Sequence, residues 1–211
     1  HRVIAPFQDR IRRNAPVLGI ARLEDEVRIS AGDGTVHRYD TVFIASHSDQ
    51  ALRALEDPTA QESEILGAIP YRENSAVLHT DTSLLPRRKR AWASWNYLLP
   101  DEDRSGSSVT YNQNILQGLD APETFCVTLN QTELIDPAKI LRTFTYHHPQ
   151  YTVASVNAQR RKREISGHQN TYYCGAYWGF GFHEDGVNSA IDAVDRFRED
   201  LACRAAYTKV G

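Results

Sequence analysis

The sequence predicts an α+β fold with an antiparallel sheet in the middle of the chain. Three observations support this class. Residues 74–99 and 107–130 are rich in β-branched and aromatic residues, with turn residues between the short runs. Residues 16–46 have the pattern of a β-meander, and residues 171–205 combine a strand, a glycine-rich loop and a helix.

The first elements are a predicted helix over residues 1–13 and the meander over residues 16–46. Within the meander, Asp33-Gly34 supplies the tight turn that a hairpin needs. The meander ends in Val42-Phe43-Ile44-Ala45, which is apolar throughout. A continuous apolar run is typical of a strand covered on both faces, as in a parallel sheet.

Two helices are predicted next, over HSDQALRAL with Ser48 as the N-cap and over TAQESEILGAI, with Asp57-Pro58 between them. Four strands follow, in SAVLHTDT, AWASWNYL, SVTYNQN and TFCVTL. Residues 136–146, DPAKILRTFTY, are predicted as a helix capped by Asp136, with Pro137 in the first turn. The last unit is the strand TYYCGA, the glycine-rich loop and a helix from about Gly186 to Ala205.

Composition excludes several classes of function. The formal net charge is −3, which gives no sign of a nucleic-acid partner. No apolar run approaches the roughly 18 residues of a membrane span, and no signal peptide opens the chain. The three cysteines lack metal-ligand spacing and indicate reduced thiols in a cytoplasmic protein, and we predict no metal site.

The most unusual segment is CGAYWGFGFHEDGVNSAIDAV, residues 174–194, which contains Gly175, Gly179, Gly181 and Gly186. Glycines let another group approach the backbone, and the following helix offers free N–H groups, so the segment has the features of an anion or cofactor site. The alternative is a tight turn that needs glycine only for positive φ angles. The fingerprint GxGxxG is absent, which argues against a self-contained dinucleotide site.

Several side chains are candidates for chemistry or binding. His79 and Asp81 are two apart on one strand and share a face, so they contact a substrate or form a structural pair, and we favour the latter. His183, in the glycine-rich loop, is a candidate for proton transfer or merely orders the loop. Trp95 and Tyr97 also share a strand face, as core residues or as the lining of an apolar pocket.

The run RRKR occurs twice, at residues 87–90 and 160–163, and holds eight of the 24 basic residues. Two such runs could receive an anionic head group or a membrane surface. The alternative, which we favour at this point, is a pair of solvated loops.

The segments HSDQAL, LHTD, WASWNY and GAYWGFGFHEDG resemble the C-terminal half of flavin-containing amine-oxidase-like proteins, FAD-dependent oxidoreductases that include bacterial predicted NAD/FAD-binding proteins. The resemblance covers nearly the whole chain. It implies a Rossmann-like FAD-domain portion at 1–60, a substrate-binding domain with the antiparallel sheet at 61–165, and the C-terminal FAD-domain strand, loop and helix at 166–211. The N-terminal dinucleotide-binding unit of the family is not in this sequence.

The resemblance also implies which residues meet the cofactor, FAD. The loop would lie along the cofactor and the helix N-terminus would face the flavin N1–C2=O edge, while the meander and the apolar strand would meet the rest of it. The matching positions are Val17, Ala45, Ser46, Gly175, Ala176, Glu184, Asp185, Gly186 and Val187. Ala176 and His183 depart from the family, which usually has an acidic or polar residue and a tyrosine there.

The function that this resemblance implies is hydride transfer from an unidentified small molecule, amine or lipid-like, to FAD. We expect the complete protein to retain FAD, and this portion alone to be inactive and to be colourless after incubation with FAD and desalting. We also expect this portion to dimerise or rearrange through exposed strand edges. The alternative is a non-catalytic ligand-binding or interaction domain. A GxGxxG encoded upstream of His1 would favour the enzyme, and a start codon there would favour the binding domain.

Overall fold

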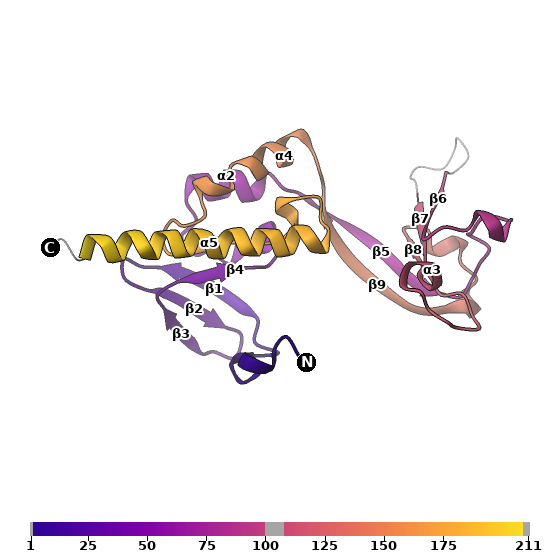
Figure 1. Ribbon diagram of the computed structural model, residues 1–211, viewed down its shortest axis with the longest axis horizontal. Helices are drawn as coiled ribbons and strands as arrows, with labels where there is room; N and C mark the ends of the chain where they lie inside the picture. The colour runs from indigo at the N-terminus through magenta and orange to yellow at the C-terminus, as the bar shows by residue number, and fades with distance from the viewer. Residues whose placement is uncertain (1, 100–107, 209–211) are drawn as a thin grey trace. The chain divides into compact units, whose positions relative to one another are not determined.

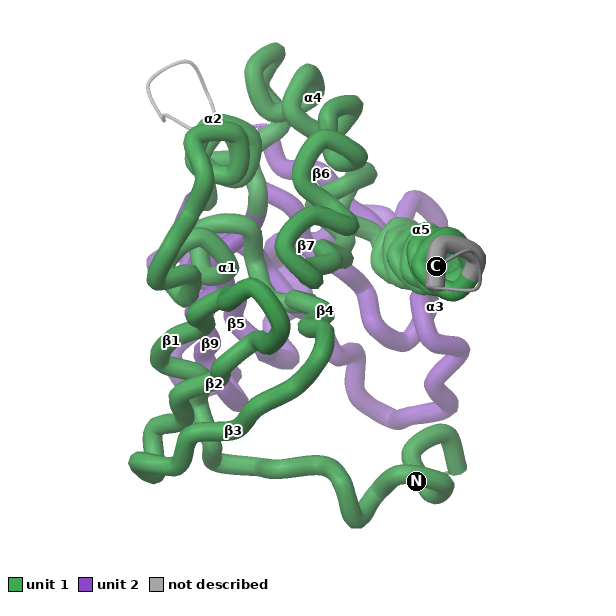
Figure 2. The backbone as a smooth tube through the Cα atoms, turned by 90° about the vertical axis from the view of Figure 1, so that its left-hand side faces the viewer, with its two compact units in different colours: residues 1–71, 149–211 green, residues 72–148 purple. Residues whose placement is uncertain are grey.

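The computed structural model describes residues 2–99 and 108–208 and divides into two compact units (Figures 1 and 2). Unit 1 comprises His1–Tyr71 and Pro149–Gly211, and unit 2 comprises Arg72–His148. Unit 2 is shorter than the substrate-binding domain expected at 61–165, because the helices on either side of it pack within unit 1. No helix in these residues is long and apolar enough to cross a membrane.

The N-terminal part of unit 1 contains the predicted meander. β1 (Val17–Arg22), β2 (Val27–Ala31) and β3 (Val36–Tyr39) form an antiparallel sheet in the order β1-β2-β3. Asp33 makes the turn, since it accepts hydrogen bonds from the Thr35 N–H at 2.9 Å and from its hydroxyl at 2.6 Å.

The helix predicted over residues 1–13 is wrong in extent and type. The structure has only the 3₁₀ helix η1 (Ala5–Arg10), in which Phe7 leaves helical geometry. No residue of η1 is buried, so tertiary packing does not hold a longer helix here.

A parallel pair of strands follows the meander. β4 (Val42–Ile44) pairs with β10 (Thr171–Tyr173). The prediction that both faces of β4 are covered is wrong, because the Phe43 side chain remains 39% exposed. On that face Phe43 stacks on Tyr172 at 5.0 Å and meets Phe197 edge-on at 5.5 Å.

Three short helices of unit 1 are α1 (Ser48–Ala54), α2 (Ala60–Gly67) and α4 (Val153–Arg160). The predicted cap of α1, Ser48, is displaced by His47, whose N–H donates to Gln50 Oε1 at 3.3 Å, while the Ser48 hydroxyl is buried without a partner in the described chain. α2 begins as predicted with a capping box. The 3₁₀ turns η5 (Lys162–Glu164) and η6 (Ala176–Trp178) lead toward the last helix.

α5 (His183–Thr208) is the long C-terminal helix and packs on β10. It begins three residues before the predicted start at Gly186. The Asp185 carboxylate explains the earlier start, because it accepts hydrogen bonds from the N–H groups of Phe180 and Phe182, each at 3.0 Å. A carboxylate in the first turn also interacts favourably with the helix dipole.

A buried polar network joins three elements of unit 1. The Arg22 guanidinium on β1 donates to Glu62 Oε2 at 2.8 Å, and the Tyr173 hydroxyl on β10 donates to Glu62 Oε1 at 2.6 Å. Burial alone would raise the pKa of Glu62, but hydrogen bonds from Arg22 and Tyr173 outweigh it and lower the pKa. The network therefore fixes β1, α2 and β10 against one another around a charged centre.

Unit 2 is built on a five-stranded sheet in the order β6-β7-β8-β5-β9. The register is antiparallel where β8 pairs with β5 and β7, and where β6 pairs with β7. The predicted strand-rich middle of the chain is therefore present as an antiparallel sheet. Its strands and short helices are β5 (Tyr71–His79), η2 (Lys89–Ala91), β6 (Trp95–Leu98), β7 (Ser108–Asn112), α3 (Gln113–Gln117), β8 (Cys126–Leu129), η3 (Thr132–Leu134), η4 (Pro137–Lys139) and β9 (Ile140–Pro149).

The helix predicted over 136–146 is wrong. Asp136 does cap a turn, accepting a hydrogen bond from the Ala138 N–H at 3.0 Å, but the turn ends with η4. β9 follows, and Lys139 O accepts a hydrogen bond from Thr80 N–H at 3.1 Å beside β5. Five of the seven residues of the segment ILRTFTY are β-branched or aromatic and favour a strand, so strand pairing overrides the local helix signal.

Candidate functional site

The ends of the two parallel strands in unit 1 bring together residues that lie far apart in the sequence. Ala45 and Ser46 follow β4, and Gly175 follows β10 after one residue. The pairing continues past β10, because Cys174 N–H donates to Ile44 O at 3.0 Å. Ligands of parallel sheets commonly bind beyond the carboxyl ends of strands, so this edge is a candidate ligand site.

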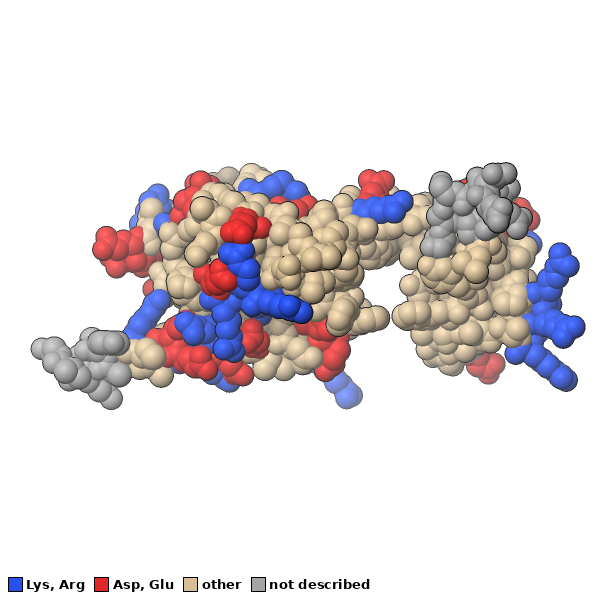
Figure 3. Space-filling view, turned by 90° about the horizontal axis from the view of Figure 1, so that it is seen from above, with Lys and Arg blue, Asp and Glu red and all other residues tan. Residues whose placement is uncertain are grey.

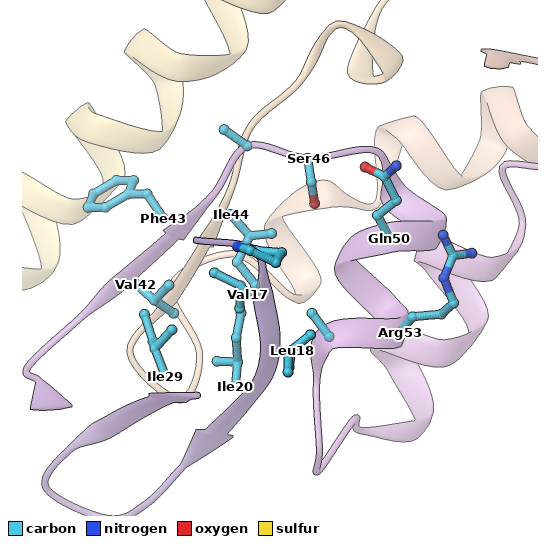
Figure 4. Close-up of a pocket in the computed structure, with 13 residues that line it drawn as sticks. Val17, Leu18, Ile20, Ile29, Val42, Phe43, Ile44, Ser46, Gln50 and Arg53 are labelled. Atoms are coloured by element: carbon cyan, nitrogen blue, oxygen red, sulfur yellow. The ribbon is translucent and has the colours of Figure 1, made fainter. Parts of the chain in front are cut away.

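A pocket of about 660 Å³ lies along β1, β4 and the start of α1 (Figure 4). Its walls are mostly apolar, and the view shows side chains of β1, β2 and β4 converging. Three predicted cofactor residues, Val17, Ala45 and Ser46, line it together. The lining residues that sequence reasoning missed are Pro16, Leu18, Ile20, Ile29, Val42, Phe43, Ile44, Gln50, Arg53 and Ala54.

Polar groups occupy one end of this pocket. Ser46, Gln50 and Arg53 lie there, the last two on α1 (Figure 4). The Arg53 guanidinium pairs with the Asp49 carboxylate at 2.8 Å on the outside of the helix. An apolar cavity with a few polar groups suits a ligand that has both a flat apolar part and hydrogen-bonding groups. The sequence carries no signal for Gln50 and Arg53, because a helix that faces a pocket has the same pattern as one that faces solvent.

The first turn of α5 sits against the end of β10. Ser189 connects the two, because its hydroxyl accepts from the Gly175 N–H at 2.8 Å and donates to Gly186 O at 2.8 Å. A Cβ placed on Gly186 would meet nothing nearer than Ala176, at 3.8 Å, which is ordinary contact. Packing within the described chain thus does not require a glycine at position 186, and a ligand has room to approach the backbone there.

The other loop glycines have partners within the chain. A Cβ on Gly179 would lie 2.5 Å from the Asp185 carboxylate, and one on Gly181, whose φ is +87°, would lie 2.6 Å from the Tyr151 hydroxyl. These two glycines therefore allow the loop to fold against its own side chains. The sequence implies that another group approaches the backbone at these glycines, and in the structure that group is a side chain of the protein itself.

The remaining residues predicted to bind the cofactor lie at the start of α5. Asp185 uses its side chain to cap the helix, and the Glu184 side chain is exposed. Val187 is exposed and lines a second pocket of about 400 Å³ along α5, which includes Ile191 and Val194. His183, the proton-transfer candidate, is exposed at the first position of the helix.

In unit 2 the sheet buries a polar face. His79 is 0% exposed; its Nε2 lies 2.8 Å from Thr128 Oγ1, and its Nδ1 accepts a hydrogen bond from the Asp81 N–H at 3.1 Å. An N–H donor on Nδ1 places the ring proton on Nε2. Burial lowers the pKa of His79, only partly opposed by the Asp81 charge, so the ring is neutral. This arrangement favours the structural alternative for His79.

Asp81 connects the end of β5 with the turn before β9. Its carboxylate accepts hydrogen bonds from the Ser83 and Asp136 N–H groups at 3.0 and 2.9 Å and from Lys139 Nζ at 3.3 Å. Burial alone would raise the pKa of Asp81, but these donors outweigh it and lower the pKa to about 2. Every contact described for this carboxylate is made within the chain.

The opposite face of the same sheet carries exposed aromatic side chains. Trp95 and Tyr97 share it as predicted, 56% and 64% exposed, and Trp95 meets Tyr111 edge-on at 5.6 Å. Asn96, between them in sequence, is buried, with its amide donating to Ala93 O at 2.7 Å. Unit 2 thus presents aromatic surface outward and polar groups inward, which is the reverse of an ordinary half-buried sheet.

Comparison with protein-family models and with curated proteins gives no match. Among solved structures, the chain is similar to cyclohexylamine oxidase from Brevibacterium oxydans IH-35A, with a TM-score of 0.64 and 14% identity over 95% of this chain and 52% of that one. It is also similar to a CLA-producing fatty acid isomerase from P. acnes, with a TM-score of 0.61 and 17% identity over 88% and 48% of the two chains. Wild-type putrescine oxidase bound to putrescine gives a TM-score of 0.61 and 9% identity, over 93% and 51%.

The chain spans about half the length of each of these structures. Identities of this size show the fold and not the activity. The matches cover 88–95% of this chain, which is consistent with the expected C-terminal position. The chain therefore has the fold of half of an amine-oxidase-like flavoenzyme.

Proposed function

We propose that unit 1 forms part of an FAD site in an oxidoreductase that takes a hydride from a small molecule. The observation that carries the proposal is the position of the 660 Å³ pocket, which reaches the carboxyl end of β4, where Ala45 and Ser46 follow the strand. The N-terminus of α5 lies at the corresponding end of the neighbouring strand β10. The solved structures with this fold include two amine oxidases, which supports oxidation as the reaction.

The residues present fit a flavin nucleotide. Gly186 leaves room for a ligand at the helix N-terminus, where a methyl group would meet only Ala176. The first-turn N–H groups of a helix have no intrahelical acceptors and attract negative charge. Val17 and its neighbours on β1 offer an apolar wall for a flat ring. The Asp185 carboxylate remains compatible with an anion because it is turned toward the loop amides.

Each part of the site then has a distinct role. Val17 would contact the adenine through its backbone, and Ala45 and Ser46 would border the middle of the cofactor. Gly175 and Ala176, with the backbone of the α5 start from Glu184 to Val187, would border the flavin. Bound FAD would supply the hydride acceptor, and helix amides aimed at its N1–C2=O edge would favour the reduced form.

The substrate remains a proposal at the level of its class. The exposed aromatic face with Trp95 and Tyr97 in unit 2 suits an apolar or cationic small molecule, such as an amine or a lipid-like chain. His183 carries the only exposed imidazole among the candidates, so we assign it any proton transfer. Asp81 and His79 are given no chemical role, because contacts within the chain occupy both.

The edge of β4 opposite β10 is where a dinucleotide-binding half would add its strand. In the described residues β4 pairs only with β10. A strand with one neighbour presents unpaired N–H and C=O groups, which another chain can use. We therefore expect self-association of this portion wherever no such half is available.

The alternative is a binding domain in which the pocket holds an apolar ligand without catalysis. The apolar walls alone would serve that function equally well. A titration with FAD, monitored by flavin fluorescence, distinguishes the FAD site from a non-catalytic binding domain. The protein is also titrated with an apolar fluorescent probe such as anilinonaphthalene sulfonate.

A pocket-filling variant makes the titration specific. Ala45→Trp places a large ring at the exposed end of β4, in the pocket. Ala138→Trp is the matched control at an exposed alanine of unit 2. The proposal predicts weak, saturable FAD binding, which does not survive desalting of this portion alone and which A45W abolishes and A138W leaves intact. Probe binding without FAD binding, sensitive to A45W, would instead favour the binding domain.

A further inference from the structure

The two RRKR runs have the same sequence but differ in whether acidic side chains pair with their cations. In the second run, residues 160–163, Lys162 is buried and its Nζ pairs with the Asp192 carboxylate at 2.8 Å. Arg161 pairs with Glu164 at 2.9 Å. Arg163 lies 3.7 Å from Asp192, so three of the four charges of this run have acidic partners within unit 1.

The first run, residues 87–90, lies in unit 2 and has no such compensation. All four side chains are exposed, and none forms an ion pair with a carboxylate in the described part of the chain. Figure 3 shows basic side chains projecting together from the unit that contains β6–β8, at the right of the view. We call residues Arg87, Arg88, Lys89 and Arg90 the basic turn.

The basic turn is held in a fixed conformation. The Trp92 indole N–H donates to Pro86 O at 2.8 Å and closes the segment. Ala91 N–H donates to Arg88 O at 2.8 Å, which forms the 3₁₀ helix η2. Lys89 Nζ lies 5.6 Å from the centre of the Trp92 ring. Four like charges are thus displayed together on an ordered turn, where their mutual repulsion opposes folding.

We propose that the basic turn is a docking surface for an anionic lipid bilayer. The turn projects outward and lines none of the pockets described above, so its partner must offer negative charge on a flat or yielding surface. A bilayer with anionic lipids does so, and its attraction to clustered Lys and Arg acts within a Debye length of the surface. The net charge of −3 is therefore no obstacle, since more distant acidic groups are screened.

Trp92 favours a bilayer over other polyanions. Tryptophan is enriched at membrane interfaces, where its ring enters the headgroup region and its N–H remains bonded. Here that N–H is already bonded to Pro86 O, at the base of the basic turn. A nucleic acid would need cations spread along a stripe that follows successive phosphates, whereas these four are confined to one turn.

Vesicle co-sedimentation tests the proposal with two variants of equal charge. The probes are vesicles of phosphatidylcholine alone and of phosphatidylcholine mixed with phosphatidylglycerol. The test variant is R87Q/R88Q/K89Q/R90Q. The control removes four exposed cations that form no ion pair in the described structure, in the variant R10Q/R13Q/R72Q/R160Q.

The protein and the control should sediment with the mixed vesicles only, and less as salt is raised. The test variant should lose roughly 10²–10³-fold in partition coefficient, since each cation near an anionic surface contributes about fivefold. Equal losses in the two variants, or no preference for the mixed vesicles, would overturn the proposal. Binding to duplex DNA that depends on the basic turn, without vesicle binding, would also overturn it and assign the turn to nucleic acid.

Circular dichroism and thermal unfolding of both variants check that the fold is kept. Removing the unpaired charges should leave thermal stability equal or higher, because their repulsion is relieved. The proposal does not depend on the FAD site, so vesicle binding is measured without flavin.

Discussion

Two glycine substitutions separate structural from ligand-binding roles in the glycine-rich loop. Gly186→Ala adds a methyl group in the first turn of α5, where the nearest atom is Ala176 Cβ at 3.8 Å. Alanine is a better helix former than glycine, so the free energy of unfolding should rise by about 0.5–1 kcal/mol. The same methyl occupies the space where FAD is proposed to approach. Affinity for FAD should therefore fall by about 10-fold or more, the usual cost of overpacking a close contact.

Gly179→Ala should behave in the opposite way. Its methyl would lie 2.5 Å from the Asp185 carboxylate, which must then move and release the Phe180 and Phe182 N–H groups. Loss of two hydrogen bonds to a charged group should lower the free energy of unfolding by about 2–4 kcal/mol.

Urea unfolding and FAD titration of both variants provide the assay. The reasoning predicts a stable Gly186→Ala protein that binds FAD weakly and a destabilised Gly179→Ala protein. If Gly186→Ala is stabilised and binds FAD as well as the parent protein, Gly186 has no role in ligand approach. The glycine-rich loop would then be purely structural.

Three further predictions concern buried ionisable side chains. Arg22→Met leaves Glu62 buried without its cation and should lower the free energy of unfolding, measured by urea titration, by about 3–5 kcal/mol. The double variant R22M/E62Q should recover part of this free energy, because it removes the buried charge as well. The folded-state pKa of Asp81, about 2, lies below its ordinary value of 3.8. The Asp81 carboxylate therefore stabilises the fold by about 2 kcal/mol above pH 3.8, and this stabilisation is lost as the pH falls from 3.8 through 2. D81N should remove this acid dependence of the free energy of unfolding, measured by urea titration. The pKa of buried, neutral His79 is lowered. The free energy of unfolding should therefore decrease below pH 6.5, the ordinary histidine pKa, because the unfolded chain takes up a proton there. H79Q should reduce this pH dependence and leave FAD affinity unchanged, and a fall in FAD affinity would contradict the structural role of His79.

Elements with a complete local signal could be predicted from the sequence. Thr59 and Glu62 form the capping box that opens α2, and Asp33-Gly34 makes the turn between β2 and β3. The apolar run at β4 correctly indicated a strand in a parallel pair. For the capping box and the turn, residues within a few positions of one another supply the deciding interactions, whereas at β4 the local apolar run indicates the strand and a distant segment supplies its partner.

Elements decided by distant partners could not be predicted. Asp136-Pro137 begins a turn as the sequence indicates, but pairing with β5, about 70 residues earlier in the chain, makes the rest a strand. Phe43 looks like a core residue, yet its exposure depends on what covers its face of the strand. Sequence patterns record a preference for burial and not the identity of the neighbour.

The same limit applies to the candidate site. Val17 and Ser46 were assigned from resemblance, and the pocket places them together. Gln50 and Arg53 were missed because a helix facing a pocket has no distinct pattern from one facing solvent. The approach of Asp185 to Gly179 was equally hidden, since it arises from how the loop folds back onto the helix.

Amide chemical-shift mapping with FAD tests the central claim most directly, because it reports where the ligand lies and whether it binds. The largest shifts should fall at Val17, Ala45, Ser46, Gly175 and Gly186, at the ends of β4 and β10 and the start of α5. Saturable shifts at these positions would place the flavin site in unit 1. Shifts confined to unit 2, or none at saturating FAD, would contradict the account.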